Sequence, residues 1–365
     1  MKISACLIVK NEEKVLEMTL PTLKEGVDEI ILVDTGSSDR TVEIAEKYGA
    51  KVYHFAWIDD FSAARNESLK YAGGDWVIWV DADEFIRSED LSALRKTLEA
   101  SQEEAYLLPI SECPLGTTEG SSFYFRVKAF KNGCGIHFER EFNEQVYRAD
   151  GRLLETKAFL PSVKIYHWGR NLSKETMQGK KERNFRILEE VLQKNPQDAH
   201  YHFLLANNYA DVGEKGKAAE EYGKVIELDS GALAAASRVK RARILVDDGH
   251  YDEAYELLKT AAAVQPWNAE VFNLIAIVYL SIGNTEKAVQ VLEHSRQLTP
   301  PQNYPMGIDL TQFGYFPNYL LGNASLLSGD KKKALEAFKS AYALNPEAGL
   351  RSKIENLEKE VDSNV

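Results

Sequence analysis

Short apolar runs alternate with amphipathic stretches along the first 85 residues. Four runs rich in Ile, Val, Leu, Trp and Tyr are bounded by polar residues or glycine, as strands are: 3–9, 29–33, 51–55 and 76–80. Helical patterns lie between them, at 12–24, 39–48 and 60–71. This alternation is typical of a mainly parallel sheet covered by helices. Further strands, predicted at 107–110, 122–130 and 163–168, extend or flank that sheet.

After residue 175 the pattern becomes almost entirely helical and repetitive. Gly213, Gly249 and Gly283 are spaced by 36 and 34 residues, and alanines and prolines recur with similar spacing. A period near 34 residues is the signature of two-helix solenoid repeats, which bury their apolar faces against their neighbours. A further unit occupies 318–346, after an insert at 300–317 that breaks the period. We therefore predict an α/β domain over 1–175 and an all-α repeat domain over 176–365.

Composition narrows the classes of partner. The 365-residue chain has a net charge of -12, which disfavours nucleic acid and an anionic membrane surface as main partners. No apolar run approaches the ~20 residues of a transmembrane helix. The three cysteines form no CxxC pair, so no structural zinc site is predicted, and their scarcity fits a reducing, cytoplasmic location.

Acidic residues follow three of the four early strands. The first strand is followed by Glu12, the second by Asp34 and the fourth by Asp81 and Asp83. Parallel sheets bind ligands at the carboxyl ends of their strands, so these acids predict a site for a cation, a ribose or both. Carboxylates are ligands that Mg²⁺ and Mn²⁺ accept alongside water and phosphate.

Each acid also has a structural alternative. Asp81 and Asp83 could be solvated or helix-capping acids. Ser38 or Asp39 would be an ordinary N-cap for the helix that follows, but a cap does not explain Asp34, which precedes the turn. Asp34 could accept hydrogen bonds from ribose hydroxyls or from a base N–H.

Several segments together resemble known families. "CLIVKNEE", "ILVDTGSSDRT", "FSAARNESLKYAGGDWVIWVDADEF" and "IYHWG" resemble, in order and spacing, the family-2 glycosyltransferases of the GT-A fold. This likeness covers about residues 1–170. "NNYADVGEKGKAAEEYGKVIELD" and "AIVYLSIGNTEKAVQVLEHSRQLTP" resemble the tetratricopeptide repeat, over roughly 185–350. The combination is similar to bacterial glycosyltransferases that modify peptides or proteins, including the peptide S-glycosyltransferases of bacteriocin pathways.

The resemblance implies a role for each candidate donor-site residue. Glu12 and Asp34 would hold the uracil and ribose of a UDP-sugar of the UDP-glucose or UDP-N-acetylglucosamine type, and Arg65 would lie near the donor, facing its phosphates. Asp81 would contact the ribose or metal-bound water. Asp83 would ligate the divalent metal, Mn²⁺ or Mg²⁺, directly, and His167 would be a further ligand. Without the resemblance, Arg65 is equally well a surface arginine of a helix, and His167 is a packed or capping histidine.

The resemblance also implies an inverting displacement that requires a general base. Related sequences carry a His-Glu pair where this chain has Asn143 and Glu144, so the histidine is replaced. Glu144 is our first candidate for the base, with its pKa raised in a desolvated site, and Glu84 is the second.

Two other functions remain open from the sequence. "VIWVDAD" fits the nucleophile strand of a haloacid-dehalogenase-type phosphatase, but that motif stands near the chain start in such enzymes and here follows three strand–helix units. A non-catalytic adaptor that works through its tetratricopeptide repeats is the other alternative. In an enzyme, the repeats would recruit a peptide or protein acceptor or form a homodimer. The sugar, the acceptor and the linkage atom are not readable from the sequence.

Overall fold

A computed structural model describes residues 1–120, 122–169, 174–301, 304 and 307–362. The chain forms two compact units, one comprising Met1–Ile187 with Asn303–Ile308 and the other Leu188–Gln302 with Asp309–Val365. The division falls inside helix α5 (Lys174–Lys194). The boundary predicted at residue 175 stays a prediction, and part of the insert predicted at 300–317 lies outside the described residues.

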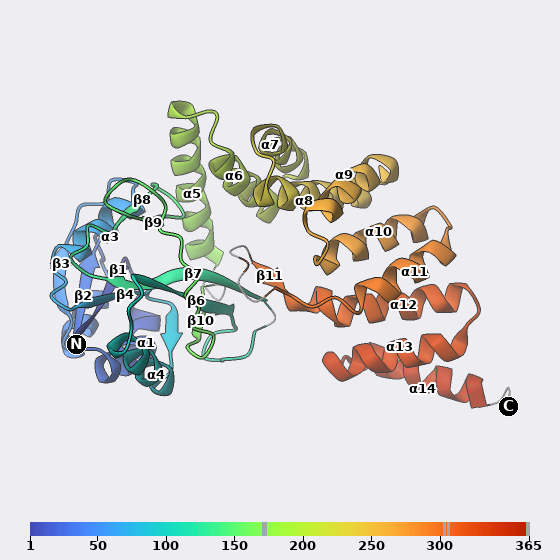
Figure 1. Cartoon of the computed structure of the whole chain (residues 1–365), viewed down its shortest axis with the longest axis horizontal. Coiled ribbons are helices and arrows are strands. Elements are labelled where there is room, and N and C mark those ends of the chain that lie inside the picture. Colours follow the sequence, from blue (N-terminus) through green and yellow to red (C-terminus); the bar gives the residue numbers. More distant parts are fainter. Residues whose placement is uncertain (121, 170–173, 302–303, 305–306, 363–365) are drawn as a thin grey trace. The chain divides into compact units, whose positions relative to one another are not determined.

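The first unit is built on one sheet (Figure 1). Over the described residues its strand order is β3-β2-β1-β4-β7-β6-β10-β5, with β11 paired to β7. Strands β3, β2, β1 and β4 are mutually parallel, β7 is antiparallel to β4 and β6, and β10 is parallel to β6. The strands of this sheet are β1 (Ile3–Val9), β2 (Glu29–Asp34), β3 (Lys51–His54), β4 (Trp76–Trp79), β5 (Glu84–Ile86), β6 (Ala105–Glu112), β7 (Ser122–Lys131), β10 (Ile165–His167) and β11 (Ile308–Asp309).

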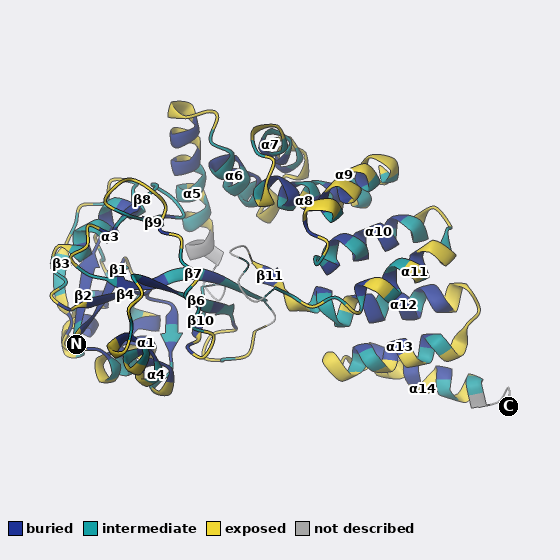
Figure 2. Ribbon diagram, viewed as in Figure 1, coloured by how far each residue is buried: buried dark blue, intermediate teal, exposed yellow. Residues whose placement is uncertain are grey.

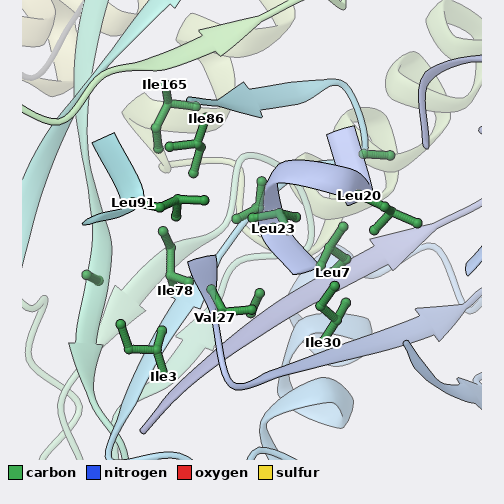
Figure 3. Close-up of a cluster of buried hydrophobic side chains, with 14 of the residues drawn as sticks. Ile3, Leu7, Leu20, Leu23, Val27, Ile30, Ile78, Ile86, Leu91 and Ile165 are labelled. Carbon is green, nitrogen blue, oxygen red and sulfur yellow. The ribbon is translucent and has the colours of Figure 1, made fainter. Parts of the chain in front are cut away.

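The two faces of the sheet bury different side chains because successive residues of a strand point to opposite sides. One face packs against α1 (Glu13–Gly26), α2 (Thr41–Lys47) and α4 (Ser88–Glu99). Figure 3 shows this core, where Leu20 and Leu23 of α1 meet Leu7 and Ile78 of the sheet. The opposite face packs against α3 (Phe61–Leu69) and the hairpin of β8 (His137–Glu139) and β9 (Gln145–Tyr147).

The second unit consists of helical hairpins. Its helices after α5 are α6 (Ala199–Asp211), α7 (Lys215–Leu228), α8 (Ala232–Asp247), α9 (Tyr251–Val264), α10 (Ala269–Ser281), α11 (Thr285–Ser295), η1 (Leu310–Phe313), α12 (Tyr315–Leu327), α13 (Lys331–Leu344) and α14 (Ala348–Asp362). The repeated glycines terminate the first helix of each hairpin with φ between 77° and 82°, a left-handed conformation that favours glycine: Gly213, Gly249, Gly283 and Gly329. The repeated alanines, Ala218, Ala254, Ala288 and Ala334, are fully buried. Figure 2 shows that the helices of this unit carry buried, intermediate and exposed positions.

The fold class predicted from the sequence is therefore confirmed: a mainly parallel α/β domain precedes a helical repeat array. The pattern did not predict α4, β5 or the β8–β9 hairpin. No helix in the described part of the chain is long and apolar enough to cross a membrane.

Candidate active site

The sheet topology brings the candidate site residues to one edge of the sheet. The strands β1, β2, β4, β6 and β10 run in the same direction, so their carboxyl ends share that edge. His167 ends β10 and is paired in register with Glu112, which ends β6. On its other side His167 is paired with Glu84, the first residue of the antiparallel strand β5. These residues are therefore neighbours because of strand register, although they are far apart in sequence.

A tight turn after β4 carries the Asp-x-Asp pair. The amide of Glu84 donates to the carbonyl of Asp81 at 3.0 Å, and the amide of Asp81 donates back to Glu84 Oε2 at 2.8 Å. The carbonyl of Asp83 accepts from the amide of Trp168 at 2.9 Å, which ties the turn to the end of β10. The turn therefore gives Asp81 and Asp83 different surroundings.

Asp83 faces His167. Asp83 Oδ1 lies 3.5 Å from His167 Nε2, and Glu112 Oε1 lies 3.0 Å from the other ring nitrogen, Nδ1. Burial opposes the charged imidazolium, but the hydrogen bonds to Asp83 and Glu112 outweigh it and raise the pKa of His167 to about 11. A carboxylate behind a histidine, as Glu112 is here, orients the free ring nitrogen of metal-ligating histidines.

The backbone near Asp83 and His167 leaves room for a cation between the two side chains. Gly169 has no side chain there, and a Cβ at this position would lie 2.6 Å from His167 Nε2 and 2.8 Å from Asp83 Oδ2. The backbone thus leaves open a point adjacent to one oxygen and one nitrogen ligand, which is chemistry that Mn²⁺ accepts. Among the described residues no three His, Cys, Asp or Glu side chains converge on one point, so phosphate oxygens and water would complete the coordination.

Arg65 of α3 joins two of the candidate acids. Its Nη2 donates to Asp81 Oδ1 at 2.5 Å, its Nε donates to Glu144, and its guanidinium lies 4.3 Å from the centroid of the Trp79 ring. Burial alone would raise the pKa of Asp81, but the Arg65 guanidinium, helped by the charge of Lys128, holds it well below its usual range. Arg65 is 4% exposed, so it is a buried ion-pair residue and not the surface arginine that the sequence left open.

Glu84, the second candidate base, is paired with a buried lysine. Its carboxylate is 1% exposed and accepts from Lys128 Nζ at 2.7 Å. Lys128 is the extra residue of a bulge in β7, because Ala129 pairs with Tyr106 while Val127 pairs with Leu107. The Lys128 ammonium also lies 3.4 Å from the Trp79 ring centroid. Burial raises the pKa of Glu84 and lowers that of Lys128, each against the attraction of its partner.

The structure treats the two donor-side acids differently. Burial raises the pKa of Glu12; nearby Lys180 opposes this, while the charge of Asp83 adds to it, so Glu12 belongs to the same cluster. Asp34 is 4% exposed and turns back on its own loop. It accepts from the amide of Ser37 at 3.1 Å and pairs with His54 Nδ1 at 3.4 Å.

The loop before β9 aims Glu144 at Arg65. Asn143 has φ of 55°, a left-handed conformation that asparagine tolerates better than most residues. Its side-chain oxygen accepts from Arg126, which also donates to the carbonyl of Glu144 at 3.3 Å. Asparagine at this position therefore has a conformational role of its own.

Sequence reasoning did not single out Glu112, Lys128 or Gly169. The first two are contributed by β6 and β7, whose register with β10, and whose bulge, no local pattern discloses. Gly169 is the last residue of the "IYHWG" segment, and a glycine directly after a candidate ligand was the sequence signal that could have identified it.

The strand order, the acids at the strand ends and the helical hairpins define a GT-A-like domain followed by tetratricopeptide-like repeats. Family models agree. Residues 4–159 match the model described as glycosyl transferase family 2, and residues 199–231, 245–304 and 317–347 match tetratricopeptide repeat models. The chain therefore carries a domain of glycosyltransferase family 2 followed by tetratricopeptide repeats, as the sequence resemblance implied.

Curated relatives carry the same two kinds of name. A tetratricopeptide repeat-containing protein of Synechococcus elongatus is 35% identical over 61% of this chain and 56% of its own length. The prophage-derived glycosyltransferase SunS of Bacillus subtilis is 27% identical over 55% of this chain and 48% of its own length. The chain thus spans about half the length of the curated relatives it matches.

Solved structures of both kinds also align. S. aureus TarS 1–349 in complex with UDP-GlcNAc aligns over 81% of this chain and 92% of that chain, with 18% identity and a TM-score of 0.38. MamA 41-end from Desulfovibrio magneticus aligns over 51% of this chain and 89% of that chain, with 19% identity and a TM-score of 0.38. These scores are low for alignments of whole chains, and the fold assignment rests on strand order and family models.

Proposed function

We propose that the protein is a metal-dependent, inverting glycosyltransferase that moves a sugar from a nucleotide-sugar donor to an acceptor. The observation that carries the proposal is the Asp83–His167 pair, with 3.5 Å between Oδ1 and Nε2, at the carboxyl edge of the sheet. Glu112 holds the imidazole from behind and Gly169 keeps the backbone clear of the ligand atoms. This arrangement differs from a set of solvated acids, because it is built from three separate strands.

Asp83 and His167 would hold Mn²⁺ or Mg²⁺, and the ion would neutralise the diphosphate that leaves with it. Asp81 is engaged by Arg65, so it suits contact with ribose or metal-bound water better than direct ligation. Glu12 and Asp34 would serve the nucleoside, with Asp34 having to exchange part of its loop hydrogen bonds for the ligand. The donor of this proposal is a UDP-sugar of the UDP-glucose or UDP-N-acetylglucosamine type.

Glu144 is our candidate for the base. Arg65 Nε occupies one carboxylate oxygen, while Oε2 forms no hydrogen bond within the described part of the chain. In the proposed step the acceptor's nucleophilic atom bonds to the anomeric carbon, its proton passes to Glu144, and the bond from that carbon to the diphosphate oxygen breaks. Attack from the face opposite the diphosphate inverts the anomeric centre. Glu84, sealed against Lys128, suits a positioning role because it contacts the Asp81 amide.

The acceptor in this proposal is a peptide or protein engaged through the repeats, because tetratricopeptide arrays present extended concave surfaces. Self-association of the repeats into a homodimer is the alternative use of the same helices. Both predictions go beyond the family assignment.

The test is a nucleotide-sugar screen with and without Mn²⁺, followed by calorimetry on the best donor. We expect binding and slow donor hydrolysis only with metal, and loss of both in Asp83→Asn. The matched control is Asp39→Asn, which alters a helix-starting acid of the neighbouring loop. A protein that binds peptides but no nucleotide sugar under any condition would instead be the non-catalytic adaptor. NMR of the product anomer tests inversion.

A further inference from the structure

The part of helix α5 that belongs to the first unit carries a row of basic residues. Lys180, Arg183 and Arg186 are three residues apart, so they lie along one side of the helix. Lys180 Nζ lies 3.5 Å from Glu12 Oε1, and Arg186 Nη2 lies 2.5 Å from Asp59 Oδ1. The Arg183 guanidinium lies 4.9 Å from the ring centroid of Phe61, the first residue of α3. All these residues belong to the first unit.

Arg183 stands out in this row because it has no acidic partner. No carboxylate of the described chain lies within 4.0 Å of its guanidinium, and its Nε is buried without a hydrogen-bond partner. Burial lowers the pKa of Arg183, and the more distant charges of Asp59 and Glu12 compensate only in part. Arg183 is half-buried, and its Nη2 donates to Asn184 Oδ1 at 3.1 Å, so the guanidinium has a neutral partner but no counter-ion among the described residues. Removing a charge from water without a counter-ion costs free energy.

Arg183 lies in the neighbourhood of Glu12, one of the two acids proposed to hold the nucleoside. The charge of Glu12 acts on Arg183, and the charges of Asp83 and Asp81 act on Glu12. Lys180 lies on the same carboxylate. Glu12 therefore lies within electrostatic range of the basic residues of α5 and of the Asp-x-Asp acids.

We propose that Arg183, assisted by Lys180, binds the diphosphate of the nucleotide-sugar donor and of the nucleoside diphosphate product. The inference rests on the proposed function, and it adds a binding group that neither the family model nor the sequence motifs contain, since α5 lies beyond residue 159. A guanidinium binds two phosphate oxygens through parallel N–H groups. The acids of the site would repel a diphosphate, so positive charge on its metal-free side balances the complex. Lys180 exchanges Glu12 for phosphate when the donor arrives.

The experiment compares the full-length wild type with Arg183→Gln, Lys180→Gln and the control Arg186→Gln. Arg186 lies one turn further along the same helix and is paired with Asp59, so its loss tests the docking of α5 alone. Calorimetric titrations use UDP and uridine, each with Mn²⁺. We expect Arg183→Gln to weaken UDP binding by about 10- to 100-fold, as for loss of hydrogen bonds to a charged group, and to leave uridine binding within about 2-fold.

The outcomes separate this inference from the proposed function. If the wild type binds UDP and Arg183→Gln binds it with the same dissociation constant, the diphosphate role of Arg183 is overturned and the proposed function is not affected. Equal weakening of UDP and uridine overturns it too, because Arg183 would then act on the nucleoside or on the fold. If the wild type binds no nucleoside diphosphate or nucleotide sugar with Mn²⁺, the proposed function itself fails. Arg183→Lys, which keeps the charge but loses the planar fork, should recover part of the UDP affinity.

Discussion

Replacing Lys128 by methionine is the most informative single perturbation of the catalytic unit. Lys128 is fully buried on the β7 bulge, and its ammonium is bonded to Glu84 and covered by Trp79. Methionine has a similar length and suits the apolar surroundings, but it leaves Glu84 without its cation. Glu84 in turn accepts a hydrogen bond from the amide of Asp81, so the change should also perturb the turn that carries Asp81 and Asp83.

The magnitude follows from the burial of the pair. Removing one partner of a buried ion pair costs about 3–5 kcal/mol, because the other charge stays behind uncompensated. For a unit of this size that corresponds to a fall of roughly 6–20 °C in the melting temperature. The double variant Lys128→Met/Glu84→Gln removes both charges and keeps an oxygen for the Asp81 amide. We expect it to be more stable than the sum of the single changes by about 2–3 kcal/mol.

The assay is urea unfolding followed by tryptophan fluorescence in a Trp267→Phe background. The other four tryptophans belong to the first unit, so the signal then reports on that unit. Lys131→Met, on the same strand but partly exposed, is the control and should cost less than about 1 kcal/mol. Single-variant costs below 1 kcal/mol that simply add in the double variant would refute a buried, coupled pair.

Three further predictions concern the metal site, the sheet and the repeats. Glu112→Gln should weaken Mn²⁺ binding by about 10- to 100-fold with little change in melting temperature, and calorimetry with Mn²⁺ measures it. The pKa of Glu29 is lowered: burial opposes its charge, but hydrogen bonds to Lys51 and Ser4 outweigh this. Its stabilising effect is therefore present above the unfolded pKa and lost as pH falls through the folded one, so Glu29→Gln should cost about 1–2 kcal/mol at pH 7 and progressively less in acid urea titrations. Gly322→Ala should destabilise the repeats by about 1–3 kcal/mol despite alanine's higher helix propensity, because its Cβ would lie 2.5 Å from the Phe338 ring; stabilisation in thermal melts would contradict this.

The strand–helix alternation and the 34-residue period were enough to predict the fold class, because both are local patterns with a single packing solution. The elements that were missed have a physical reason. Strand β5 has three residues, and β8 and β9 have three each, too few to establish an alternating pattern. Helix α4 is amphipathic, but its first turn is acidic and comes soon after the Asp-x-Asp motif, so the start of a helix was not recognised there.

The candidate site could be predicted only where its residues follow strands directly. Asp81 and Asp83 were found because strand ends of a parallel sheet face ligands. Glu112 could not be found in this way, since its role depends on the register between β6 and β10. The surroundings of Glu84 and Glu144 were equally hidden: each needed a cation supplied from another element, Lys128 for the first and Arg65 for the second.

These cations explain why acids so close together take different roles. Arg65 is paired with both Asp81 and Glu144, and Lys128 is paired with Glu84. Asp83 instead faces the ring of His167, and an imidazolium that gives up its proton when a cation binds can become a metal ligand, whereas a guanidinium cannot. The two acids of the Asp-x-Asp turn thus differ in their surroundings, because Arg65 engages Asp81 and not Asp83, and this difference supports the proposed role of Asp83 as the metal ligand.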